Sequence, residues 1–179
     1  MNIKYVIAID PSINNVGCAV FEKSSKKLLD KIIIHPSKFV KNATYLQKAR
    51  DICSQIVRVM KSVSKCTVDN HVDMTFPDIQ LVTEIPQHFG VGGYMSRESG
   101  AMLKLTFIAG MIFNITDNVI SYEPNQWKGQ LPKDVVARRL QKLYPKEKIF
   151  DLKTKKFIID HNIADAIGIG HKHLYGKIE

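Results

Sequence analysis

The sequence predicts an α/β fold, in which a three-stranded meander plus parallel strands forms a mixed central sheet with helices on its faces. Three observations predict it. The chain has 179 residues, the size of one domain with a buried core. Its apolar patterns follow the order strand, strand, strand, helix, strand, helix, strand, helix, so a meander is followed by crossover connections. The first and fourth strands each end in a carboxylate, and ligands of open α/β sheets gather beyond such strand ends.

The first three predicted elements are strands. Residues 4–10 form an apolar run that ends at Asp10, and Asn and Gly residues that tolerate positive φ follow it. The strand pattern resumes over residues 18–21 and 28–35, which predicts an antiparallel meander.

The later segments alternate between helical and strand patterns. Apolar residues recur at helical spacing over residues 44–63. Residues 79–84 and 119–122 have the pattern of buried strands. Further helices are expected over residues 96–114, from Pro132, which suits a first helical turn, and from Ile163 onwards. Since repeats, low-complexity tracts and linkers are lacking, residues 1–179 are expected to form a single domain.

The chain is strongly basic, with 26 Lys and Arg against 17 Asp and Glu and a formal charge of +9. Such an excess raises the local concentration of polyanions, among which nucleic acid is the commonest partner. A second explanation stays open, because the Lys, Ile and Asn usage also fits an AT-rich genome.

Targeting and membrane signals are not found in the sequence. Residues 1–10 lack a basic region followed by a long apolar run. The most apolar segment, Leu103–Ile115, is interrupted by Lys104 and is shorter than the roughly 20 residues that cross a bilayer. The three cysteines form no CxxC pair, which favours reduced, buried thiols. We expect a cytoplasmic protein (host cytoplasm for a viral source) with no membrane contact and no small-molecule cofactor.

Two carboxylates stand at the ends of predicted buried strands. Asp10 closes the first strand and Glu84 the fourth, so the two side chains converge if these strands are neighbours. Like charges that close repel each other, and a divalent cation is the usual remedy. A plainer role stays open for each carboxylate, as a cap of the turn that follows its strand.

A third acid, Asp165, lies in the last predicted helix. Asn162 stands three residues before it, so both lie on one face of a helix. Asn162 is also a suitable N-cap residue, and it is expected to be the cap, a ligand or both.

Four short segments, in order along nearly the whole chain, match the motifs of one family. They are Ile9-Asp-Pro-Ser-Ile-Asn-Asn-Val-Gly17, Val82-Thr-Glu84, Leu103-Lys-Leu-Thr-Phe-Ile-Ala-Gly110 and Ala164-Asp-Ala-Ile-Gly-Ile169. In this register the chain resembles the RuvC-type Holliday-junction resolvases of the ribonuclease-H-like superfamily, with a phage or viral source left open.

The resemblance implies a ribonuclease-H-like fold and a metal-dependent endonuclease. Such an enzyme resolves four-way or other branched DNA junctions by paired symmetric nicks, which leave 5′-phosphate and 3′-hydroxyl ends. It also implies two Mg²⁺ ions about 3.5–4 Å apart, replaceable by Mn²⁺, one activating water and one stabilising the leaving 3′ oxygen. Asp10 would bridge both ions, with Glu84 on one and Asp165 on the other. These three residues and Asn162 are the predicted catalytic and metal-binding set.

Three positions depart from the family pattern. Ser12 replaces a glycine of the first turn. Asn162 stands where the superfamily usually has Asp and sometimes His, so Asp160 and His161 are kept as substitute ligands. The family has an aromatic wedge three residues after its glutamate, whereas Phe89 lies five residues after.

The DNA-binding candidates lie outside the carboxylate motifs. Phe89 and Tyr94, in a glycine-rich loop, are expected to stack on an unpaired base at the crossover. Lys128 and Lys133 are expected to hold phosphates, and Trp127 beside them either takes part or anchors a loop. Residues of a solvated helix face that would touch the DNA backbone are Arg138, Arg139 and Lys142.

Other functions were weighed against junction cleavage. A ribonuclease-H-like nuclease acting on RNA–DNA hybrids would share the metal site, and a junction-binding protein without catalysis is left open by Asn162. An actin-like ATPase or sugar kinase needs two such domains and a second phosphate loop. The sequence leaves cut-site preference, substrate range and partner proteins open.

We expect a homodimer, because symmetric cleavage of a junction requires two sites and two-fold pairing is the commonest oligomer. The apolar helix from Met102 to Phe113 is the predicted contact, and the alternative is that this helix is entirely core in a monomer.

Overall fold

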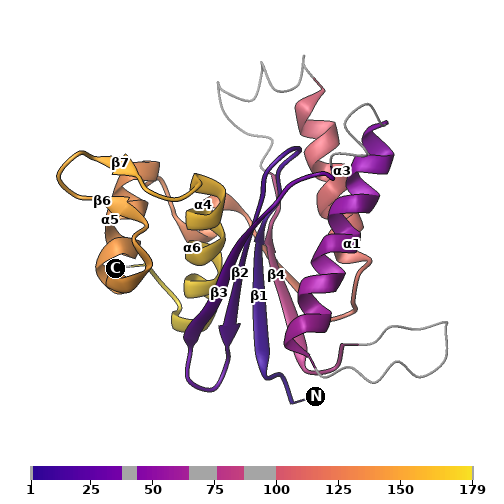
Figure 1. The fold of residues 1–179 in the computed structure, drawn as a ribbon, viewed down its shortest axis with the longest axis horizontal. Coiled ribbons are helices and arrows are strands. Elements are labelled where there is room, and N and C mark those ends of the chain that lie inside the picture. Colours follow the sequence, from indigo (N-terminus) through magenta and orange to yellow (C-terminus); the bar gives the residue numbers. More distant parts are fainter. Residues whose placement is uncertain (1, 38–43, 65–75, 87–99, 179) are drawn as a thin grey trace.

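The computed structural model describes residues 2–37, 44–64, 76–86 and 100–178. Its centre is a five-stranded sheet of order β3-β2-β1-β4-β5 (Figure 1). Neighbouring strands are antiparallel between β3, β2 and β1, and parallel between β1, β4 and β5. The predicted mixed sheet of a meander plus parallel strands is therefore confirmed. The strands are β1 (Tyr5–Asp10), β2 (Val16–Glu22), β3 (Lys27–Ile34), β4 (Ile79–Glu84) and β5 (Val119–Tyr122).

Helices cover both faces of the sheet, and each face has its own core (Figure 1). Strand β1 is buried on both sides, with Val6 and Ala8 in one core and Ile7 and Ile9 in the other. One face carries α1 (Tyr45–Val63) and α3 (Ala101–Phe113); the other carries α4 (Pro124–Trp127), α5 (Lys133–Leu143) and α6 (His161–Tyr175).

The helix starts follow local capping chemistry. Thr44 caps α1 in a capping box, where Thr44 N donates to the Gln47 side chain over 2.8 Å. Pro132 precedes α5 as its N-cap, with extended backbone. The expectation that Pro132 lies inside the first helical turn is therefore wrong by one residue, although the helix itself is confirmed.

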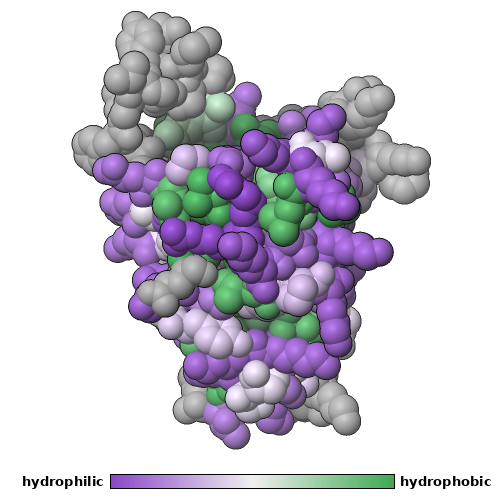
Figure 2. Space-filling view, turned by 90° about the vertical axis from the view of Figure 1, so that its left-hand side faces the viewer, coloured by the Kyte–Doolittle hydropathy of each residue, from purple (hydrophilic) through white to green (hydrophobic). Residues whose placement is uncertain are grey.

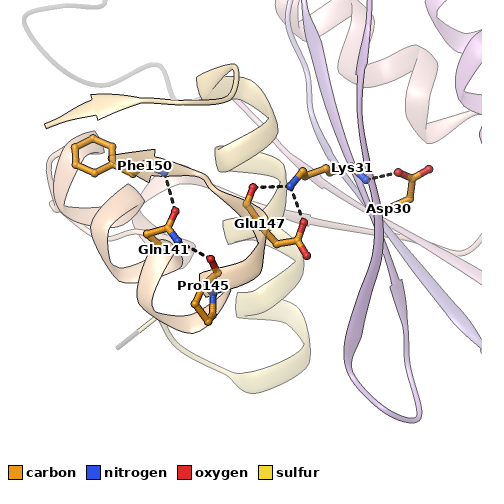
Figure 3. Close-up of polar contacts among 6 residues, drawn as sticks. All are labelled: Asp30, Lys31, Gln141, Pro145, Glu147 and Phe150. Carbon is orange, nitrogen blue, oxygen red and sulfur yellow. Dashed lines mark hydrogen bonds and ion pairs between the residues drawn. The ribbon is translucent and has the colours of Figure 1, made fainter. Parts of the chain in front are cut away.

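A small hairpin, β6 (Phe150–Asp151) and β7 (Lys156–Phe157), was not predicted. Each strand has only two residues, which is too short for an alternating pattern to emerge. Figure 3 shows polar contacts that hold this region in place. Gln141 of α5 accepts from Phe150 N over 3.0 Å, and Lys31 of β3 donates to the carbonyl and the carboxylate of Glu147, each over 2.6 Å.

The face formed by α5 and the hairpin is mostly hydrophilic, with small apolar areas between polar side chains (Figure 2). No helix in the described ranges is long and apolar enough to cross a membrane. Cys18 is buried and Cys53 is half-buried, both as free thiols, while Cys66 lies outside the described residues.

Candidate active site

The candidate site lies at the edge of the sheet where β1 and β4 end. The two strands are parallel neighbours, with Ile9 beside Thr83, so their last residues emerge at the same edge. Those residues are Asp10, which is only 8% exposed, and Glu84, which is half-buried. The sequence predicted that the two carboxylates converge if their strands are neighbours, and β1 and β4 are indeed neighbours.

Helix α6 brings Asn162 and Asp165 to this edge, both buried. The helix starts directly on β2: a Cβ added to Gly17 would lie 1.9 Å from the carbonyl oxygen of Asn162. Only glycine permits so close an approach of two backbones. Because Gly17 pairs with Asp10 between β2 and β1, the same contact fixes the start of α6 relative to Asp10.

Asp160, and not Asn162, is the N-cap of α6. Its Oδ1 accepts a hydrogen bond from Asn162 N over 2.8 Å and lies 3.7 Å from His161 Nδ1. The interpretation of Asn162 as the cap is therefore wrong, because the helix begins at His161, two residues earlier than the predicted Ile163. Asn162 lines the same cavity as the three carboxylates, whereas Asp160 and His161 do not.

A cavity of about 410 Å³ connects these side chains. The ends of β1 and β4, the loop after β1, the start of α3 and the first turns of α6 all contribute to its wall. Its polar lining, which gathers carboxylates, amides and ammonium groups around one space, consists of Asp10, Ser12, Asn14, Glu84, Lys128, Lys133, Asn162 and Asp165.

The ionised forms of Asp10 and Glu84 are destabilised at this edge. Burial raises the pKa of Asp10 well above its usual value, and the nearby charges of Asp165 and Glu84 raise it further. Burial likewise raises the pKa of Glu84. The charge of Lys128 and a hydrogen bond from Trp127 partly offset this increase. Burial is the main cause of both raised pKa values, and for Asp10 the neighbouring carboxylates add to it.

Two lysines approach the carboxylates from the rim. Lys128 Nζ lies 3.9 Å from Glu84 Oε2, and Lys133 Nζ lies 3.7 Å from Asp165 Oδ2. Both distances are long for an ion pair, and Lys133 is more than half exposed, so its pair contributes little to stability.

The donor set suits a divalent cation. Within the described ranges, no three His, Cys, Asp or Glu side chains are gathered closely enough to hold an ion as they stand. The cavity nevertheless offers three carboxylates and the two amides of Asn14 and Asn162, and their oxygens are the hard ligands that Mg²⁺ prefers. An ion there would stabilise the ionised form of Asp10, which burial and the two neighbouring carboxylates disfavour, so the residues fit the predicted metal.

The other predicted DNA contacts are only partly described. Arg138 is exposed and pairs with Asp134 over 2.8 Å, while Arg139 donates to the carbonyl of Ile178 at the C-terminal end. The structure keeps both on α5, away from the cavity lining. Phe89 and Tyr94 lie outside the described residues.

Sequence reasoning missed the part that Trp127 has in the site. The residue is buried at the end of α4, and its Nε1 donates to Glu84 Oε2 over 2.6 Å. The loop-anchor interpretation captured the burial but not this contact. The only sequence signal was the Glu-x-x-Gln capping pattern of Glu123 and Gln126, which builds the turn that carries Trp127.

The structure of the whole chain is similar to solved Holliday-junction resolvases. Thermus thermophilus RuvC in complex with a Holliday-junction substrate matches with a TM-score of 0.65 at 19% identity, over 96% of this chain and 94% of that chain. Another Thermus thermophilus RuvC structure gives a TM-score of 0.51 at 19% identity, over 96% and 95% of the two chains. The yeast mitochondrial Holliday-junction resolvase gives 0.49 at 12% identity, over 94% and 78%.

No protein-family model and no curated protein sequence matches the chain. The relationship to known proteins therefore rests on structural similarity alone, and at 19% identity that similarity establishes the fold. The chain has the ribonuclease-H-like fold of the RuvC-type resolvases, as the four motifs predicted.

Proposed function

We propose that this protein is a Mg²⁺-dependent endonuclease that resolves four-way or other branched DNA junctions. The observation that carries the proposal is the single cavity at the carboxyl edge of β1 and β4, where Asp10, Glu84 and Asp165 meet two lysines. The similar RuvC structure holds a Holliday-junction substrate, which supports branched DNA as the ligand class.

In this proposal the acidic residues divide the work of holding metal. Asp10, Glu84, Asp165 and Asn162 would together hold the ions, since all four line the cavity. Bound there, the ions would supply activation of a water and charge stabilisation of the leaving 3′ oxygen, and the ends would be a 5′-phosphate and a 3′-hydroxyl. Asn162 lacks a charge but offers its amide oxygen, which is sufficient for a hard cation.

The lysines would change partner when metal and DNA bind. Lys128 and Lys133 now face Glu84 and Asp165 over distances of 3.9 Å and 3.7 Å. Once the carboxylates hold divalent ions, their attraction for the ammonium groups falls, and a phosphate becomes the better partner. The formal charge of +9 would assist capture of DNA from solution.

We also propose that the working unit is a homodimer that makes paired nicks. The helix singled out by the sequence is not entirely core: α3 buries Ile108, Ala109 and Ile112 but leaves Leu103 76% and Phe107 42% exposed. With Tyr45 and Leu46 of α1, these side chains line an almost wholly apolar hollow of about 410 Å³. An exposed apolar surface of this kind marks an interaction site, and a second copy is the partner that symmetric cleavage requires.

One experiment tests the proposal. The protein is incubated with four-way, forked, duplex and RNA–DNA hybrid substrates of matched sequence, with Mg²⁺ and with EDTA. We expect paired, symmetric nicks on the four-way junction, with ligatable 5′-phosphate and 3′-hydroxyl ends, only with Mg²⁺.

The alternatives are separate outcomes of the same experiment. Preferential cleavage of the hybrid would identify a ribonuclease for RNA–DNA hybrids instead. Junction binding with no cleavage at any Mg²⁺ or Mn²⁺ concentration would identify a junction-binding protein without catalysis.

A further inference from the structure

Trp127 makes an unusual contact for a core residue. It is 3% exposed and belongs to the apolar cluster on the α6 face of the sheet, yet its Nε1 donates to Glu84 Oε2 over 2.6 Å. A hydrogen bond to an ionised carboxylate is short and strong compared with one between neutral groups. One oxygen of Glu84 is therefore engaged by the indole, and the other is left for a ligand in the cavity.

The indole itself is held firmly. A Cβ added to Gly168 of α6 would lie 2.6 Å from Cζ3 of Trp127, so the ring lies against helix backbone where no side chain fits. Lys128 Nζ stands 4.7 Å from the ring centroid. The short helix α4 is fixed by its capping box, in which Glu123 N donates to the Gln126 side chain over 2.7 Å.

These contacts link two elements that carry carboxylates. Trp127 touches α6 at Gly168, one turn after Asp165, and touches β4 through Glu84. We infer that Trp127 is a positioning residue, which holds the Glu84 carboxylate at a fixed place relative to α6 so that the two carboxylates meet a divalent ion in one arrangement. The inference rests on the proposed function, since it needs the site to bind Mg²⁺.

The alternative role for Trp127 is packing alone. A packing role depends on the ring and not on its N–H, whereas the positioning role depends on the N–H. Groups that orient metal ligands typically contribute about 10-fold to 100-fold in metal affinity. Loss of the N–H is therefore expected to weaken Mg²⁺ binding by about that factor while the fold and DNA binding persist.

The first test uses Trp127 as its own reporter, because it is the only tryptophan of the chain. Mg²⁺ is titrated into the protein without DNA, following tryptophan emission and, in parallel, heat by calorimetry. We expect a saturable emission change with the midpoint of the calorimetric binding curve, absent in Glu84→Gln. Tyr144→Phe is the matched control, because it loses a 2.8 Å contact with His171 in the same core but none with a carboxylate; it should respond like the wild type.

The outcomes separate this inference from the proposed function. Mg²⁺ binding by calorimetry with no change in emission would overturn the positioning role and leave the nuclease proposal standing. No Mg²⁺ binding in either measurement would overturn both.

The second test removes the donor. Trp127→Phe keeps an aromatic ring, and biosynthetic replacement of the single tryptophan by benzothienylalanine puts sulfur where the indole has N–H and keeps the ring size. Both proteins should bind Mg²⁺ about 10-fold to 100-fold more weakly by calorimetry, with metal-free junction binding unchanged. Gly168→Ala, which displaces the indole, should do the same. If either folded donor-free protein, judged by its melting temperature, binds Mg²⁺ within twofold of the wild type, Trp127 only packs.

Discussion

Helices α6 and α3 pack on opposite faces of the same sheet and are used in different ways. Every residue of α6 from Asn162 to His171 is buried. The start of its backbone lies against Gly17 of β2, its Gly168 lies against Trp127, and its Gly170 lies against side chains of the sheet. In α3 only three residues are buried. The difference indicates that α6 fixes the geometry of the site, while α3 keeps apolar side chains at the surface.

The largest expected effect concerns the carboxylate site that α6 helps to form. Asp10→Asn, Glu84→Gln and Asp165→Asn each remove a charged metal ligand and little basic surface. Loss of metal-based charge stabilisation of several kcal/mol corresponds to a fall in cleavage rate of about a thousandfold or more. Cleavage and junction binding are measured side by side, and we expect binding to persist. A variant with full cleavage removes its residue from the site.

The next effect separates the fourth ligand from the helix cap. Asn162→Ala should lower the cleavage rate by at least about tenfold, which corresponds to one lost ligand interaction of roughly 1.4 kcal/mol. Asn162→Asp should tighten Mg²⁺ binding, because it adds a charge at the cavity. The matched control is Asp160→Ala, which removes the cap bond to Asn162 N and should cost about 1 kcal/mol of stability while cleavage is retained. Equal losses of activity in both alanine variants would contradict the assignment.

The exposed apolar surface of α3 is tested by introducing a charged side chain into it. Leu103→Asp places a carboxylate in the apolar hollow without touching the core, so the free energy of unfolding should change by no more than about 0.5 kcal/mol. We expect sedimentation at micromolar concentration to show a dimer for the wild type and a monomer for the variant, with paired nicks replaced by single ones. Leu152→Asp, equally apolar and 52% exposed on the hairpin, is the control. A wild-type monomer that still makes paired nicks would rule out the dimer.

The glycines of the two helices give a direct comparison of packing. A Cβ on Gly170 of α6 would lie 2.2 Å from the Phe21 ring and 3.0 Å from the Ala8 side chain. Overpacking of this kind costs about 1–3 kcal/mol. Gly170→Ala should lower the free energy of unfolding by that amount, measured by urea denaturation, and should impair cleavage because α6 carries Asp165. An unchanged denaturation midpoint would show that α6 is less tightly seated than the structure indicates.

The sequence predicted the five-stranded sheet and the four main helices because long, periodic apolar segments are controlled by burial. Asp10 and Glu84 could be predicted as site residues because each ends a buried strand. Whether β1 and β4 are neighbours was the one point that the sequence left open. What could not be predicted depends on contacts between distant segments. Asn162 was kept open as a cap, a ligand or both, although Asp160 two residues earlier suits a cap equally well and is the one that caps α6. The bond from Trp127 to Glu84 joins residues 43 positions apart. The hairpin was missed because its strands are two residues long.

The smallest expected effect concerns Gly110 of α3, where nothing in the described chain lies within 4 Å of an added Cβ. Alanine is the better helix former, so Gly110→Ala should raise the free energy of unfolding of the monomer by about 0.5–1 kcal/mol. Such a gain, opposite in sign to the loss at Gly170, would confirm that the two helices differ in how closely they are packed. The variant should be compared with the wild type by urea denaturation in the Leu103→Asp background, where no dimer complicates the measurement. If alanine stabilises the monomer but weakens the wild-type dimer, the space beside Gly110 is filled by the partner. If it destabilises even the monomer, α3 is packed more closely than the structure shows.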